Sequence, residues 1–78
     1  MQKYVVTDID LDKEFVFYDQ YKTKADGSTC KAINGLELAK EKYKELKQHN
    51  EGHKLTITRL YPNYHMNTVI TDLIESNV

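Results

Sequence analysis

The segment Gly35–His49 reads GLELAKEKYKELKQH, and it decides the fold. Apolar residues recur within it at spacings of three and four, which is the period of an amphipathic helix: Leu36, Ala39, Tyr43 and Leu46. Asn34 is a natural N-cap before the segment, and Gly52 is a natural terminator after it. We therefore expect one long helix whose single apolar stripe must pack against another element.

The chain before this helix has the pattern of a β-hairpin. From Lys3 to Leu11 the residues alternate, with one face carrying Val5, Ile9 and Leu11 and the other carrying Val6, Asp8 and Asp10. The segment 14–21, EFVFYDQY, is rich in aromatic and β-branched residues, and Asp12-Lys13 can form a tight turn before it. We expect two antiparallel strands, with Asp8 and Asp10 pointing to solvent.

The chain after the helix contains a third strand and one ambiguous segment. Residues 54–61, KLTITRLY, alternate as a strand does, and Pro62 is expected to end it. From about Thr68, the apolar residues Val69, Ile70, Leu73 and Ile74 cover one arc of a helix but divide between both faces of a strand. The β-branched run 68–71 argues for a strand, but amphipathicity favours a short C-terminal helix.

These elements predict an α+β fold of two layers, in which an antiparallel sheet packs on one long helix. The expected order is β-β-α-β-α with three strands, and the alternative is β-β-α-β-β with four. With 78 residues, the chain is expected to form a single domain, 1–78. The polar stretch 22–31, which contains Asp26-Gly27, is expected to be a joint between elements.

Composition excludes several classes of protein. The net charge of −1 is that of neither a strongly cationic nucleic-acid binder nor an acidic mimic of nucleic acid. Cys30 is the one cysteine, so no intramolecular disulfide can form, and a half-buried thiol is expected. No apolar run approaches the roughly 20 residues that span a bilayer. We expect a cytoplasmic protein without membrane contact.

Three acidic residues form the most motif-like feature of the sequence. Asp8, Asp10 and Asp12 alternate as in the first half of an EF-hand loop. However, the glycine position of that motif is Lys13, and its twelfth position is Asp19 instead of a bidentate glutamate. We therefore expect no bound metal, and we interpret the three carboxylates as an acidic ridge that attracts a basic partner.

Other ligand and nucleophile types are present without a recognisable setting. His49, His53 and His65 lack zinc-binding spacing with Cys30, and we expect them to lie on the surface. The sequence contains no nucleophile elbow, phosphate loop or dinucleotide fingerprint. A chain of this length offers little concavity for a substrate. We expect neither enzymatic activity nor a cofactor.

Six tyrosines point to binding. Tyr43 belongs to the apolar helix stripe, whereas we expect exposure among Tyr18, Tyr21, Tyr61 and Tyr64. Tyrosine contributes large contact area to protein interfaces at low entropic cost, and it also stacks on bases of single-stranded nucleic acid.

The leading hypothesis is a non-enzymatic protein-binding module that uses the acidic hairpin and the exposed tyrosines. Its candidate contact residues are Asp8, Asp10, Asp12, Tyr18, Tyr21, Tyr61 and Tyr64. Residues 1–30 carry a net charge of −2 and residues 31–54 one of +2, a polarity that suits docking to another protein or to a second copy. The alternative is a nucleic-acid-binding module that uses sheet tyrosines and the lysines of the loop and helix.

The composition also resembles a broad class of proteins. A short, lysine-heavy chain without catalytic motifs is similar to the accessory proteins of phages and mobile elements. This resemblance implies an inhibitor that blocks or redirects a host protein.

Overall fold

The first antiparallel hairpin and the helix form, but the first strand ends at Asp8 instead of Leu11, the turn occupies 9–12, and the segment expected to be one strand, 14–21, is divided at Asp19. In the computed structural model, which describes residues 2–49 and 51–78, strands β1 (Lys3–Asp8) and β2 (Lys13–Tyr18) pair antiparallel. Helix α1 (Gly35–His49) follows, and its start is capped because the Asn34 side chain accepts hydrogen bonds from the backbone N–H groups of Leu36 and Glu37. The α+β class and the antiparallel sheet are confirmed.

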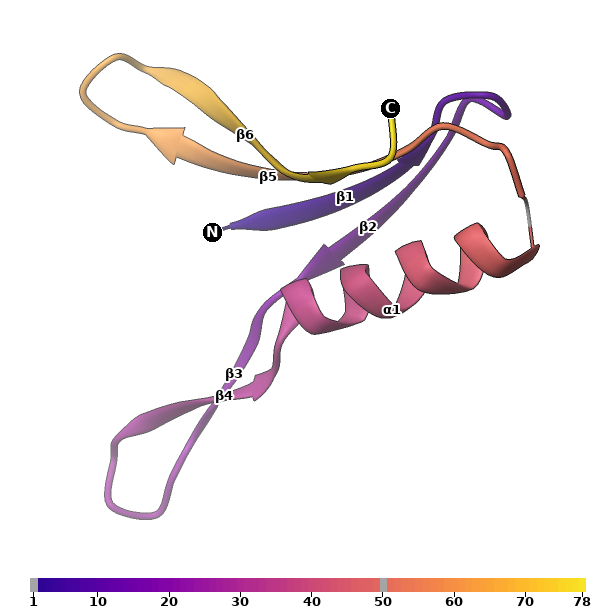
Figure 1. Ribbon diagram of the computed structural model, residues 1–78. Helices are drawn as coiled ribbons and strands as arrows, with labels where there is room; N and C mark the ends of the chain where they lie inside the picture. Colours follow the sequence, from indigo (N-terminus) through magenta and orange to yellow (C-terminus); the bar gives the residue numbers. More distant parts are fainter. Residues whose placement is uncertain (1, 50) are drawn as a thin grey trace.

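The main sheet has four strands in the order β2-β1-β5-β6. Strand β5 (Leu55–Asn63) pairs with β1 on one side and with β6 (Thr68–Ser76) on the other. Helix α1 covers one face of β1, β2 and β5, while the opposite face of the sheet is open (Figure 1). The element order in the structure is β-β-β-β-α-β-β, so the expected β-β-α-β-α order is wrong.

The predicted C-terminal helix is replaced by β6. Ile70, Asp72 and Ile74 lie on the helix side of the sheet, and the inward position of Asp72 interrupts the apolar alternation. Arg59 lies opposite Asp72 on β5 and donates a hydrogen bond of 2.7 Å to its carboxylate. This pairing lets a β-branched segment form a strand, as its side-chain types favour, although its pattern resembles that of a helix.

Pro62 also lies inside β5 and does not end it. Strand β1 begins at Lys3, opposite Leu60, so among the described residues Pro62 pairs with a strand on one side only, where it is opposite Val69. A proline is tolerated in a sheet where its missing N–H faces no partner. The strand therefore continues to Asn63, and its hairpin with β6 extends beyond the main sheet (Figure 1).

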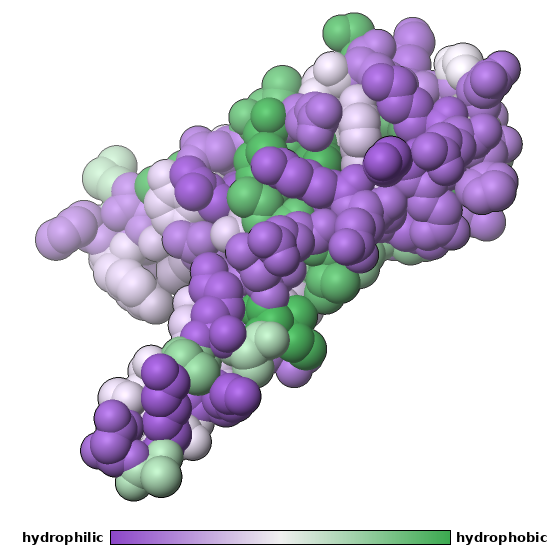
Figure 2. Space-filling model, turned by 60° about the horizontal axis from the view of Figure 1, so that its bottom comes forward, coloured by the Kyte–Doolittle hydropathy of each residue, from purple (hydrophilic) through white to green (hydrophobic). Residues whose placement is uncertain are grey.

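The polar stretch before the helix forms a second, two-stranded sheet that the sequence analysis missed. Strands β3 (Gln20–Thr23) and β4 (Thr29–Ile33) pair antiparallel around a turn in which Gly27 has a φ of 87°. The Asp26 carboxylate accepts hydrogen bonds from the backbone N–H and the hydroxyl of Ser28. This β3–β4 arm projects from the body with a mostly hydrophilic surface (Figure 2).

The arm and the β5–β6 hairpin give the molecule an open shape. The radius of gyration is 14.8 Å, whereas a compact domain of this length would have about 11.5 Å. The buried core lies between the sheet and α1, and its members are Tyr4, Val6, Ala39, Tyr43, Leu46, Leu55 and Ile57. Within the described ranges, no helix is long and apolar enough to cross a membrane.

Candidate interaction surfaces

A groove of about 500 Å³ lies between the β3–β4 arm and the end of β5. Three tyrosines from different segments line it: Tyr21 of β3, Tyr61 of β5 and Tyr64 of the turn after β5. Tyr21 is 62% exposed and Tyr64 is 84% exposed. We call this the tyrosine groove; its remaining lining residues are Gln2, Asp19, Lys31 and Pro62. Three of the four tyrosines predicted as contacts therefore meet at one place.

The root of the arm is held by a buried carboxylate. Asp19, between β2 and β3, is 7% exposed and accepts a hydrogen bond of 2.8 Å from the backbone N–H of Gly35. Its other oxygen lies 3.3 Å from the ammonium of Lys31 on β4. The hydrogen bond to Asp19 raises the pKa of Lys31. The arm is thereby tied to the start of α1, which positions Tyr21 on the groove.

On the other side of the groove, the Tyr61 ring is positioned by the guanidinium of Arg59. The Arg59 guanidinium lies 5.1 Å from the centre of the Tyr61 ring and is fixed by its ion pair with Asp72. The hydrogen bond to Asp72 raises the pKa of Arg59. Lys31, which lines the groove, and Arg59, which lies over Tyr61, both have carboxylate partners, so these two cations do not form a basic track.

Tyr18, the fourth predicted contact, lies elsewhere. It ends β2 opposite Lys3, on the open face of the sheet, and is 44% exposed. A smaller groove of about 330 Å³ is lined by Lys3, Leu60, Tyr61, Pro62 and Val69. Tyr18 is thus an exposed tyrosine outside the lining of either groove.

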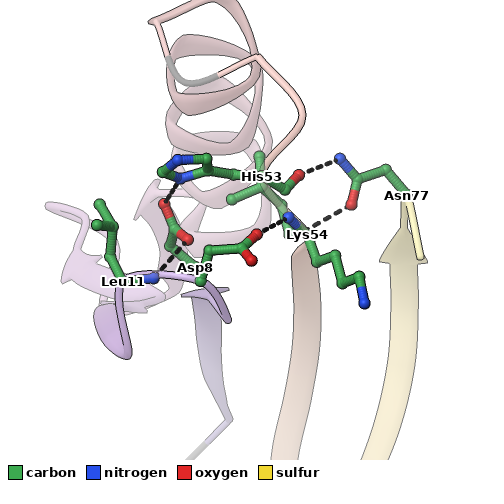
Figure 3. A network of polar contacts seen from close by, with 7 residues as sticks. Asp8, Leu11, His53, Lys54 and Asn77 are labelled. Carbon is green, nitrogen blue, oxygen red and sulfur yellow. Dashed lines mark hydrogen bonds and ion pairs between the residues drawn. The ribbon is translucent and has the colours of Figure 1, made fainter.

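The acidic residues do not form the expected ridge. Asp8 was expected to point to solvent, but its side chain is fully buried on the face of the sheet that α1 covers. Its carboxylate lies 2.8 Å from Nδ1 of His53 and accepts a hydrogen bond from the backbone N–H of Leu11 (Figure 3). Only Asp10 and Asp12 remain exposed, at the end of β1 remote from Gln2 and the tyrosine groove. The structure therefore separates the acidic turn from the tyrosines.

The contacts around Asp8 join three parts of the chain. Asp10 accepts a hydrogen bond from the backbone N–H of Lys54, and Asn77 bridges the backbone of His53 and Leu55 (Figure 3). The turn after β1, the start of β5 and the end of the chain meet here, and we call these contacts the Asp8 joint. His53, expected on the surface as a helix-end histidine, is half-buried and serves as its central partner.

The same residues offer metal-ligand atoms. One ligand atom each of Asp8, Asp10 and His53 lies within 4.8 Å of the others. The carboxylates of Asp8 and Asp10 already accept hydrogen bonds from backbone N–H groups, and Asp8 also pairs with the imidazole of His53. The contacts that the structure shows are therefore those of a structural joint, in which protein donors satisfy the carboxylates.

We predict that the Asp8 joint stabilises the protein above pH 4 and not in strong acid. Burial raises the pKa of Asp8, but the hydrogen bonds and charge of His53 together with the Leu11 N–H outweigh it, so the pKa lies below its usual 3.8. A carboxyl group whose pKa is lowered by folding contributes stability above its unfolded pKa, and this contribution is lost as the pH falls through the folded value.

The variant Asp8→Asn tests this prediction, because asparagine keeps the shape of the side chain and removes its charge. At pH 7 its melting temperature should be several degrees below that of the wild type, and the difference should narrow below pH 4. Asp12→Asn is the matched control, because Asp12 is exposed and asparagine tolerates its φ of 53°. A difference for Asp8→Asn that stays constant from pH 7 to pH 2 would contradict the prediction.

Most of the site depended on tertiary contacts that local sequence does not reveal. Residue type alone points to Tyr21, Tyr61 and Tyr64, but no sequence signal indicates Asp19, Lys31 or Gln2 as their neighbours in the groove. Cys30, as expected, is half-buried and free. Comparisons of the chain with protein families, with curated proteins and with solved structures find no match.

Proposed function

We propose that this protein is a non-enzymatic binding module that holds a segment of another protein in the tyrosine groove. The observation that carries the proposal is the convergence of Tyr21, Tyr61 and Tyr64 from three segments on one open groove. Tyrosines are enriched at protein interfaces because each buries a large area, loses little conformational entropy and keeps a hydroxyl for hydrogen bonding.

The shape of the groove suits an extended polypeptide. It is open to solvent between two hairpins, and Pro62 adds an apolar surface beside the rings. Aromatic-lined grooves of this kind bind extended, proline-containing segments in other proteins. The neutral ion pairs at its sides, Asp19–Lys31 and Arg59–Asp72, leave little net charge to attract a nucleic-acid backbone.

The biological role in this proposal is that of a phage or mobile-element accessory protein that inhibits or redirects a host protein. Its support is the composition of the chain, which is short and rich in lysine and lacks catalytic motifs. A module of this kind acts by occupying a surface of its target, so binding alone is sufficient for the effect.

Affinity capture tests the groove directly. We expect the protein to recover one dominant partner from a lysate of its host, and the double variant Tyr21→Ala/Tyr64→Ala to reduce that recovery by about tenfold or more, as loss of tyrosine anchors does. Both side chains are exposed, so the fold should be retained, and far-ultraviolet circular dichroism checks this. Tyr18→Ala removes an exposed tyrosine outside the groove and should leave recovery unchanged.

A second experiment separates the protein partner from nucleic acid. Titration with single-stranded and duplex oligonucleotides should show no binding at low salt. Tight binding that weakens steeply with salt would support the alternative of a nucleic-acid module, because phosphate contacts release counterions. Recovery of the partner that is equal for the wild type and the double variant would remove the groove as the contact surface.

A further inference from the structure

Strand β6 leaves a long sheet edge without a partner. It is the last strand in the order β2-β1-β5-β6, and among the described residues no strand pairs with its outer side. Its nine residues, TVITDLIES, contain no proline, lysine or arginine. Natural proteins usually protect such edges with these residues, with bulges or with a covering element, because the free backbone groups can pair with another strand.

Two protective features are present. Asp72 carries an inward-pointing charge, which its ion pair with Arg59 compensates, and a bulge affects only the end of the strand. The register between β5 and β6 shifts between Ile57 and Thr58, so Ile74 is an extra residue on β6. A bulge of this kind twists an edge away from regular pairing. The segment 68–73 before the bulge stays regular.

The regular segment exposes apolar side chains at matched positions. Val69 is 63% exposed and Leu73 is 64% exposed, and both lie on the open face of the sheet. They are two residues on either side of Thr71. A strand that pairs antiparallel with a copy of itself about Thr71 brings residue 69 opposite residue 73 twice.

We propose that two copies of this chain associate through antiparallel pairing of their β6 edges, with the two-fold axis at Thr71. Val69 of each copy then lies opposite the partner's Leu73, and the two Thr71 side chains face each other. Apolar and Thr–Thr cross-strand pairs of this kind stabilise antiparallel sheets. The four-stranded sheets of the two copies join into one continuous sheet.

Charge and apolar pairing favour a two-fold axis at Thr71 over an axis at the residue before or after it. With the axis at Thr71, Asp72 lies opposite the partner's Ile70. An axis at Asp72 would place two carboxylates directly opposite each other, which is destabilising. An axis at Ile70 would leave Leu73 opposite the partner's Asn67, so that its apolar side chain has no apolar partner.

The proposed dimer is independent of the tyrosine groove. No residue of β6 lines that groove, so each copy keeps its groove open after pairing. A pair of short edge strands buries less area than a standard interface, and we expect a dissociation constant on the order of 1–100 µM. Sedimentation between about 1 µM and about 1 mM covers this range.

Charged substitutions at the paired positions 69 and 73 test both the dimer and its register. We expect the wild type to change from its monomer mass of 9.1 kDa to twice that mass as concentration rises. Val69→Lys/Leu73→Lys places like charges opposite each other and should weaken association at least about tenfold. Val69→Lys/Leu73→Glu places opposite charges across the axis and should restore it. Both positions are exposed, and circular dichroism verifies the fold of each variant.

Cross-linking gives a second readout of the same geometry. In a Cys30→Ser background, Thr71→Cys should form a disulfide-linked dimer on mild oxidation, because Cα atoms directly opposite each other on antiparallel strands lie about 4.5–5.5 Å apart, within the range of a disulfide. Thr68→Cys should not, because its two copies would be about 20 Å apart. A wild type that stays monomeric at about 1 mM, or association that Val69→Lys/Leu73→Lys leaves as strong as in the wild type, would overturn the proposal.

Discussion

Tyr43→Ala is expected to destabilise the protein by about 3–5 kcal/mol, as deletion of a buried ring does. Tyr43 lies on the buried face of α1, is 5% exposed and belongs to the core formed with the sheet. A protein of this length has a free energy of unfolding of about 4–12 kcal/mol. The loss is therefore a large share of this stability, and urea denaturation followed by circular dichroism measures it.

Two variants on the same helix serve as controls. Tyr43→Phe keeps the ring and removes the hydroxyl, and we expect a small change, because the ring makes most of the buried contact. Leu38→Ala removes a side chain that is 38% exposed and should cost much less than Tyr43→Ala. Equal losses at positions 38 and 43 would show that the apolar stripe of α1 is misassigned.

Gly35→Ala is expected to destabilise the protein by about 1–3 kcal/mol, the usual cost of overpacking. In an ordinary helix this change stabilises, because alanine has the higher helix propensity. Here, however, a Cβ on Gly35 would lie 2.7 Å from the backbone carbon of Tyr18 and 3.0 Å from the backbone nitrogen of Asp19. Since these are backbone atoms, the first turn of α1 must move away from the root of the arm.

The expected movement breaks a specific contact. The N–H of Gly35 donates to the buried carboxylate of Asp19, so displacement of the helix weakens the joint that holds β3 and β4. Hydrogen exchange of the arm amides should therefore increase in Gly35→Ala. Gly27→Ala is the control at the other end of the arm: apart from its chain neighbours no atom lies within 4 Å of its Cβ position, so the strain of its φ stays at the tip and exchange at the root of the arm should not change. A Gly35→Ala variant more stable than the wild type would contradict this description of the helix start.

The fold was predictable where the periodic pattern of apolar residues matches the residues that are buried in the structure. Helix α1 has both an apolar stripe and a capping residue, and its bounds and buried face match the prediction. The β1–β2 hairpin was also predicted, but β1 ends at Asp8 instead of Leu11, the strand expected over 14–21 ends at Tyr18, and the faces differ. Asp8 shares the buried face with Tyr4 and Val6, where a carboxylate is unexpected unless a partner satisfies it.

The missed elements lack a signal within their own sequence. Strands β3 and β4 have no strongly buried face, so their residues show no apolar alternation, although the Asp26-Gly27 turn between them was recognisable. The apolar residues of β6, Val69, Ile70, Leu73 and Ile74, fit one arc of a helix and divide between the two faces of a strand. The inward position of Asp72 is explained only by its pairing with Arg59 across the sheet.

The sequence by itself therefore determined the class of fold, the central helix with its buried residues, the first hairpin and the types of residue suited to binding. These features depend on local periodicity, which a short segment contains completely. Tertiary structure alone decided that Asp8 is buried against His53, that β6 is an edge strand, and that Tyr21, Tyr61 and Tyr64 meet in one groove. Such features arise from contacts between residues far apart in the chain, and a buried charge or an interrupted pattern is stable only because a distant partner compensates it.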